Sequence, residues 1–268
     1  MAKLTTDATR RAVDLVRKVC QIAGDKKLID DAKDRLKQCG VIDSRGRIAE
    51  NPTPKIFDFL VDLFKYQGVS DNIADKYVKN HDQVHWPDIA NALAAKPSCP
   101  KLTNFKMFNR CGYKKSTNGE GGMCAEPKHF SGCPLPHHDL RKGSLNQNAY
   151  SLFLFMRDVA GGDFVRWVDA QLDTVDPDPA DDRPARLRQA LLTPLKEIYG
   201  VGDKLLSMAL SDLLLGAGAH RPIWTEAGGA MIAVDTMVHN FLHWGAARLT
   251  ETSGCGKFHC NWRFRNDV

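Results

Sequence analysis

The feature that most constrains this chain is a glycine-rich break between two short helical runs near residue 200. Thr193-Pro194 is typical of an N-cap followed by a first helical residue, and the apolar spacing beyond it predicts a helix to about Tyr199. Gly200-Val201-Gly202 then ends that helix, because glycine accepts positive φ while the valine can insert into the core. A second apolar helix starts near Asp203, so residues 193–214 predict a helical hairpin.

Such a hairpin exposes backbone N–H groups at its turn and at the N-terminus of its second helix, where they lack intrahelical partners. A phosphate oxygen accepts hydrogen bonds from groups of this kind without regard to base sequence. The sequence therefore predicts a contact with the nucleic-acid backbone. The predicted DNA-binding residues are Gly200, Val201, Gly202 and Asp203.

The string from Gly200 to Lys204, followed downstream by Val234-Asp235-Thr236, resembles the helix-hairpin-helix (HhH-GPD) superfamily of DNA glycosylases. The resemblance covers about Leu145 to Ala247. In bifunctional members the lysine two residues after the second hairpin glycine is the nucleophile, and an aspartate opening a later helix is essential. The matching residues are Lys204 and Asp235, so the resemblance implies a base-excision glycosylase with AP lyase activity.

The chain departs from the family pattern at two places. Tyr199 stands where a proline is usual, and the segment between Lys204 and Asp235 is considerably longer than in most members. A comparably long spacing is similar to that of the archaeal 8-oxoguanine glycosylases. The longer segment bears on which base is removed more than on which reaction occurs.

The proposed chemistry requires these residue types. A neutral amine can attack the sugar C1′ and form a Schiff base, and partial burial of Lys204 in the first turn of a helix would favour the neutral form. Asp235 can cap its helix and also stabilise the positive charge that develops on the sugar.

Two other functions fit the same residues. In a monofunctional glycosylase, Asp235 would activate a water molecule and Lys204 would only contact phosphate. A non-enzymatic, metal-stapled helix-hairpin-helix protein would bind duplex DNA without releasing a base. A Gly-x-Gly hairpin occurs in both classes, so the motif alone does not separate them.

A segment with little apolar content and many Cys and His residues precedes the hairpin. Three thiolates and an imidazole match the ligand set of a structural zinc site, and an iron–sulfur cluster is the alternative metal. Cys99 could replace the histidine in a four-cysteine site. The predicted ligands are Cys111, Cys124, Cys133 and either His137 or His138.

A glycosylase turns the target base out of the duplex and recognises it with polar or aromatic side chains. We expect such side chains near the cleft. The amide residues at the start of an apolar helix are the first candidates, although Gln147 also fits a capping box that begins at Ser144. The complete set of candidates is Asn146, Gln147, Asn148, Trp224 and His239.

The spacing of apolar residues along the rest of the chain predicts an all-α protein. The family resemblance implies that its helices form two subdomains around a cleft. Amphipathic helices are expected near Ala8–Ile22, Leu28–Gln38, Pro54–Tyr66, Ile89–Ala95 and Asp163–Leu172, with an apolar central helix near residues 145–156. The expected organisation is 1–96 as a helical region packing with the glycosylase core, 97–143 as the metal-stapled insert, 144–250 as the core, including a catalytic Asp region at 232–245, and 251–268 as a basic aromatic tail.

Composition is compatible with a polyanionic partner. The 268 residues carry a formal net charge of +5, which suits double-stranded DNA containing a damaged or modified base. No apolar leader or membrane-length run is present in the sequence, so we expect no membrane partner. We further expect a monomer in the cytoplasm, associated with the nucleoid.

Overall fold

The structure is a computed structural model, and it describes residues 25–66, 71–81, 84–110, 135, 143–175 and 182–231. Within these ranges the chain is helical, and the β contact found there is an isolated antiparallel bridge between Ile42 and Ile48. The prediction of an all-α protein is confirmed for this part of the chain. By its contacts the chain divides into two compact units, and one of them, Lys26–Ala233, contains all of the described residues except Asp25.

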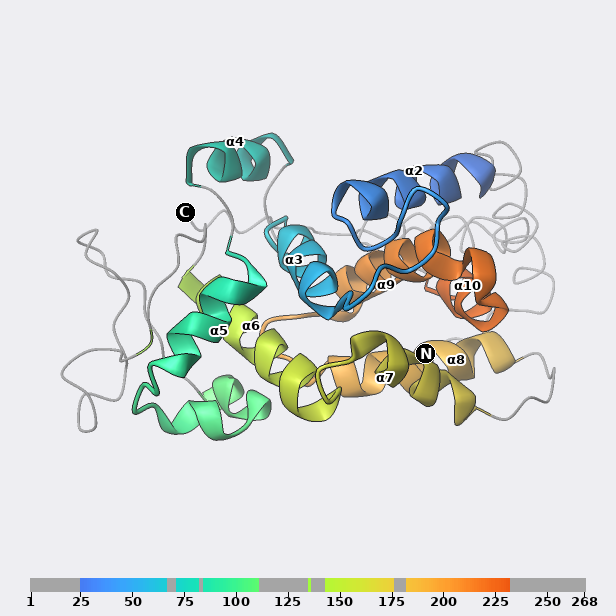
Figure 1. Cartoon of the computed structure of the whole chain (residues 1–268). Coiled ribbons are helices and arrows are strands. Elements are labelled where there is room, and N and C mark those ends of the chain that lie inside the picture. Colours follow the sequence, from blue (N-terminus) through green and yellow to red (C-terminus); the bar gives the residue numbers. More distant parts are fainter. Residues whose placement is uncertain are drawn as a thin grey trace, which may run out of the picture. The chain divides into compact units, whose positions relative to one another are not determined.

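The described elements follow one another along the chain as coloured in Figure 1. The first group comprises α2 (Asp25–Gln38), α3 (Thr53–Phe64), α4 (Asp71–His81), α5 (Trp86–Ala94) and the short 3-10 helices η1 (Pro100–Thr103) and η2 (Phe105–Arg110). The second group comprises α6 (Gly143–Leu154), the π-helical turn η3 (Phe155–Val159), α7 (Phe164–Asp173), α8 (Arg183–Leu195), α9 (Asp203–Ala217), η4 (Gly218–His220) and α10 (Pro222–Gly229).

Helix α6 lies at the centre of the core. Every side chain from Leu145 to Met156 is buried, and α6 contacts α3, α5 and η2. Aromatic rings join these helices, since Trp86 of α5 lies 4.2 Å from Phe153 and 5.4 Å from Phe57 of α3 between ring centroids. The predicted central helix is confirmed, because burial on all sides is what an apolar circumference requires.

Helix α9 organises the other side of the core and contacts α3, α8 and α10 (Figure 1). Helix α2 approaches it closely at Gly216, where an added Cβ would lie 2.7 Å from a methyl carbon of Leu36 and 3.0 Å from the backbone of Ala32. A glycine therefore permits this approach, since a side chain at residue 216 would displace α2.

The predicted bounds of the first hairpin helix are wrong. The structure starts α8 at Arg183 and ends it at Leu195, so Thr193-Pro194 lies in its last turn and not at its start. Pro184 occupies the first turn instead, and buried leucines at 187, 191, 192 and 195 supply a continuous apolar face. That face keeps the chain helical through Pro194 to Leu195, and residues 196–202 form the turn.

Other expectations agree with the structure where it describes the chain. The helices expected near Leu28–Gln38, Pro54–Tyr66, Ile89–Ala95 and Asp163–Leu172 are present as α2, α3, α5 and α7. Asp163 caps α7 by accepting a hydrogen bond from the backbone N–H of Arg166. The sequence did not predict α4, α10 or residues 183–192 of α8, and the segment Ala8–Ile22 lies outside the described residues.

Candidate functional site

The turn between α8 and α9 has the backbone conformation that its glycines permit. Gly200 has φ of +75°, in the region that L side chains rarely adopt, as the sequence predicts. Gly202 is extended and occupies the N-cap position of α9, which begins at Asp203. Val201 between them is buried, so the turn is fixed to the core by one apolar side chain.

Two side chains of α6 hold the peptide groups of Tyr199, just before the turn glycines. The Asn148 amide donates a hydrogen bond of 2.6 Å to the carbonyl oxygen of Tyr199. The Ser151 hydroxyl accepts one of 3.0 Å from the Tyr199 N–H and donates another of 3.0 Å to the carbonyl of Phe105 in η2. We call Asn148 and Ser151 the Tyr199 anchor; through it the central helix sets the position of the turn.

Charged side chains surround the same turn. Lys196 lies 2.8 Å from the carboxylate of Asp203, and Lys106 of η2 lies 3.4 Å from the carboxylate of Glu197. Both pairs are partly exposed, so each lysine can exchange its carboxylate partner for a phosphate at modest cost. Sequence reasoning missed Lys196, although its place just before the Gly200-Val201-Gly202 turn is visible in the sequence.

Lys204 is the second residue of α9, and its side chain is exposed. The expectation of partial burial is therefore wrong in this structure. Its helical position has another consequence, because residues four apart share a face of a helix. Lys204 thus lies on the same face as Met208, one turn before it.

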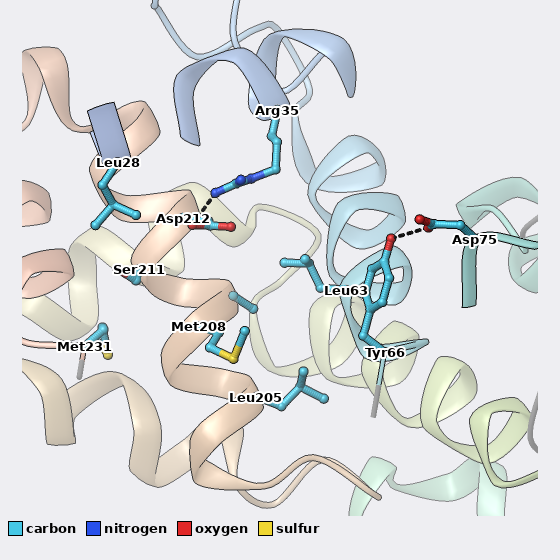
Figure 2. Close-up of a pocket in the computed structure, with 11 residues that line it drawn as sticks. Leu28, Arg35, Leu63, Tyr66, Asp75, Leu205, Met208, Ser211, Asp212 and Met231 are labelled. Atoms are coloured by element: carbon cyan, nitrogen blue, oxygen red, sulfur yellow. Dashed lines mark hydrogen bonds and ion pairs between the residues drawn. The ribbon is translucent and has the colours of Figure 1, made fainter. Parts of the chain in front are cut away.

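That face of α9 lines a cavity of about 550 Å³ between α9, α2, α3 and α4 (Figure 2). The first cavity residue on α9 is Leu205, directly after Lys204, and the lining continues through Met208 to Asp212. Apolar walls come from neighbouring elements, with Leu28 on α2, Leu63 on α3 and Met231 after α10. This volume falls in the range of small-molecule pockets in proteins.

Two polar pairs stand in the same wall. A guanidinium nitrogen of Arg35 lies 2.7 Å from the carboxylate of Asp212, and the Tyr66 hydroxyl donates a hydrogen bond of 2.7 Å to Asp75. Burial raises the pKa of the Asp212 carboxyl, and the nearby Arg35 opposes part of that rise. Sequence reasoning missed Asp212, although an acid inside the apolar run Leu205–Leu215 is a visible signal.

The residues predicted to read a base lie in different surroundings. Asn146, Gln147 and Asn148 are buried in α6, and Asn148 holds the turn as described above. Trp224 is fully buried, and its indole N–H donates a hydrogen bond of 2.7 Å to Asp169 of α7. These side chains are absent from the lining of the cavity beside Lys204.

Several predicted site residues lie outside the described part of the chain. These are the catalytic candidate Asp235, the base-reading candidate His239 and the metal ligands Cys111, Cys124, Cys133, His137 and His138. Among the residues that are described, no three His, Cys, Asp or Glu side chains gather closely enough to hold a metal ion. Cys99 is described and lies half-buried against the core.

Comparison with known proteins gives no family, since no protein-family model, curated protein or solved structure matches this chain. In the described part of the chain, none of the helices has both the length and the apolar character needed to cross a bilayer.

Proposed function

We propose that this protein is a DNA glycosylase with AP lyase activity that removes a damaged or modified base from duplex DNA. Lys204 is the proposed nucleophile, and Asp235, outside the described residues, is the proposed electrostatic partner. The observation that supports the proposal most is the position of Lys204 in the first turn of α9, between the glycine turn and Leu205, the first residue of α9 that lines the cavity. An amine, a phosphate-binding turn and a cavity are the parts that excision of an extruded base needs.

The proposed reaction begins at the Lys204 amine and ends with cleavage of the strand. The Lys204 amine attacks C1′ of the sugar while the bond from C1′ to the base breaks, and the base leaves with the electron pair and takes up a proton. The amine loses its proton, and the sugar ring opens to give a Schiff base between Lys204 and C1′. Loss of a proton from C2′ then expels the 3′ phosphate, which is the AP lyase step.

The turn supports this reaction by holding the backbone of the substrate. The N-terminus of α9 carries N–H groups without intrahelical partners and the positive end of the helix dipole. Lys196 adds a mobile positive charge at the same place. Because the Tyr199 anchor fixes the turn to α6, a bound phosphate would have a defined position relative to Lys204.

The proposed metal site lies in the segment that follows η2. Phe108 of η2 is fully buried near Tyr150 of α6, and Leu135 is also buried, so the chain contacts the core shortly before Cys111 and shortly after Cys133. We propose that Cys111, Cys124 and Cys133, with His137 or His138, hold a structural zinc ion. Metal analysis of the purified protein tests this, and replacement of Cys111 or Cys124 by serine is expected to remove the metal.

Trapping with borohydride tests the nucleophile directly. A panel of duplexes, each carrying 8-oxoguanine, thymine glycol, uracil or an abasic site, is incubated with the protein and reduced. We expect a covalent protein–DNA adduct with at least one duplex, and its loss in Lys204→Gln. Lys55→Gln is the matched control, because Lys55 is also an exposed lysine in the first turn of a helix, α3.

The outcomes separate the three candidate functions. Base release without an adduct, abolished by Asp235→Asn, would support the monofunctional glycosylase. Tight duplex binding with neither base release nor strand cleavage on any duplex would support the non-enzymatic DNA-binding protein. An adduct that persists in Lys204→Gln would reject Lys204 as the nucleophile while leaving the reaction class in place.

A further inference from the structure

The cavity next to the first turn of α9 contains the ion pair of Asp212 and Arg35, in walls that also carry the Tyr66–Asp75 pair. Asp212 belongs to α9, whose neighbouring positions Leu213 and Leu214 are buried, and Arg35 reaches it from α2 (Figure 2). The Asp212 side chain is 18% exposed and that of Arg35 is 43% exposed. Holding a carboxylate in such a place costs free energy that an apolar residue would not, so its presence calls for a chemical reason.

The pair is placed at a useful distance from Lys204. Asp212 lies eight residues after Lys204 on the same side of α9, which is about 12 Å along the helix axis at 1.5 Å per residue. Met208 lies between them and contributes to the cavity wall. A nucleotide whose C1′ meets the lysine would therefore extend its base along Met208 towards Asp212.

The chemistry of the wall restricts the occupant. An ionised carboxylate only accepts hydrogen bonds, and a guanidinium only donates them. Within the described residues Asp212 pairs with Arg35 through one oxygen, so its second oxygen can accept from an occupant. Leu63, Leu205 and Met208 offer apolar surface on which a flat ring can lie. The matching ligand is a planar heterocycle with an N–H donor next to an acceptor.

We propose that Asp212 and Arg35 read the edge of the excised base, Asp212 accepting from a ring or exocyclic N–H and Arg35 donating to the adjacent carbonyl or ring nitrogen. This inference rests on the proposed function, since it assigns recognition residues to the same site. The proposed reaction at Lys204 is unchanged by this assignment. Asp212 and Arg35 are specificity-determining residues, and neither takes part in bond breaking.

A structural role for the pair makes a different prediction. If the ion pair only ties α2 to α9, its loss would weaken the fold and reduce every activity in parallel. A pre-formed abasic site separates the two roles, because it requires Lys204 and the hairpin turn but offers no base to read. The ratio of base release to abasic-site cleavage is therefore the informative quantity.

The experiment compares wild type, Asp212→Asn and Arg35→Met on the lesion duplex that wild type processes best and on the abasic duplex. We expect the ratio of base release to abasic-site cleavage to fall on the order of 10- to 100-fold in both variants, the discrimination that one good base contact supplies. Asp34→Asn is the control, because Asp34 is an exposed carboxylate on α2 in an ion pair with Lys37, and its ratio is expected to match wild type.

A second measurement changes the substrate and not only the protein. Methylating the N–H that faces Asp212 is expected to stop release of the base by wild type and to be partly tolerated by Asp212→Ala, which removes the clash and the acceptor together. An unchanged ratio in both single variants, or the same loss on methylation with and without Asp212, would overturn the inference. If wild type cleaves the abasic duplex in those same assays, the proposed function survives that result. If wild type acts on neither duplex, both proposals fail.

Discussion

At the residue scale, the two glycines of the hairpin turn have different backbone conformations and different roles. Gly200 has φ of +75°, whereas Gly202 has φ of −100° and ψ of 165°, which any L residue adopts. An added Cβ at residue 202 would meet no atom within 4 Å, and at residue 200 it would come within 3.9 Å of the Asn148 amide nitrogen. Backbone conformation, and not space, therefore distinguishes the two positions.

Alanine substitution tests this distinction. Gly200→Ala is expected to lower the free energy of unfolding by about 1–2 kcal/mol, the cost of a left-handed conformation with a side chain. Gly202→Ala is the matched control and is expected to cost less than about 1 kcal/mol, because it loses only the preference for glycine over alanine at the N-cap. Urea denaturation of the two variants measures both values, and equal losses would contradict the assignment of strain to Gly200.

Asp43 gives a pH-dependent prediction at the same scale. Its carboxylate accepts a hydrogen bond of 2.9 Å from the backbone N–H of Arg47, and this bond, assisted by the Arg47 side chain and the Arg45 N–H, lowers its pKa from the ordinary value of 3.8. Because the folded pKa is the lower one, the stabilisation is fully present above the unfolded pKa and is lost as pH falls through the folded value.

The stability difference between wild type and Asp43→Asn is therefore expected to be largest near neutral pH and to shrink below about pH 4. Urea denaturation at a series of pH values measures this difference. A difference that stays constant down to pH 2.5 would show that Asp43 contributes through shape alone.

At the element scale, α6 positions the hairpin turn as well as filling the core. Its Ser151 hydroxyl is fully buried and joins two elements, since it accepts from Tyr199 at the turn and donates to Phe105 in η2. Removing it would leave a donor and an acceptor of the backbone without that partner. A buried polar group in this state costs far more than an exposed one.

Ser151→Ala is expected to destabilise the protein by about 1–3 kcal/mol and to speed amide hydrogen exchange at Tyr199. Thr103→Ala is the control, because the Thr103 hydroxyl also donates to a backbone carbonyl, that of Pro100, but is exposed. It is expected to cost less than about 0.5 kcal/mol. Faster exchange at Tyr199 in the control as well would indicate general loosening and not loss of the anchor.

The helices also differ in how well the sequence predicted them. Apolar periodicity predicted α2, α3, α5, α7 and the burial of α6, because each helix carries its own face. It placed the start of α8 at Pro194, since proline usually begins a helix, although the leucine spacing from 187 to 195 extends through it. Positive φ in the glycine turn was predicted, because it is a local property of residue type, but the turn begins at residue 196, earlier than predicted.

The cavity was not predictable in this way. Its lining comes from α2, α3, α4 and α9, which are far apart in the chain, and Arg35 meets Asp212 only after these helices have packed. The exposure of Lys204 is similarly a tertiary property. Sequence spacing could place that lysine in the first turn of a helix but could not say what covers it.

At the scale of the whole molecule, the net charge of +5 favours binding of a polyanion but does not identify the residues that contact it. The hairpin turn provides a specific candidate for such a contact, because Lys196 lies beside the N-terminus of α9 in a partly exposed ion pair with Asp203. A duplex phosphate that binds there would displace Asp203 and release a counterion.

Lys196→Gln is therefore expected to weaken duplex binding and to reduce the slope of log affinity against log salt concentration by about 1. Lys55→Gln, which removes the same charge from the first turn of α3, is expected to leave the slope at the wild-type value. Fluorescence anisotropy with an undamaged duplex at several salt concentrations measures both. Identical slopes for all three proteins would place the phosphate path elsewhere.

The hydrogen atom that serves as the side chain of Gly216 has an effect beyond its own position. Arg35 and Asp212 meet one helical turn away from the place where Gly216 lets α2 come near α9. A methyl group there would lift α2 and with it the guanidinium, so the width of the cavity depends on a residue that is not part of its wall. Selection for a larger or smaller occupant could therefore act on this remote crossing while the recognising side chains stayed the same.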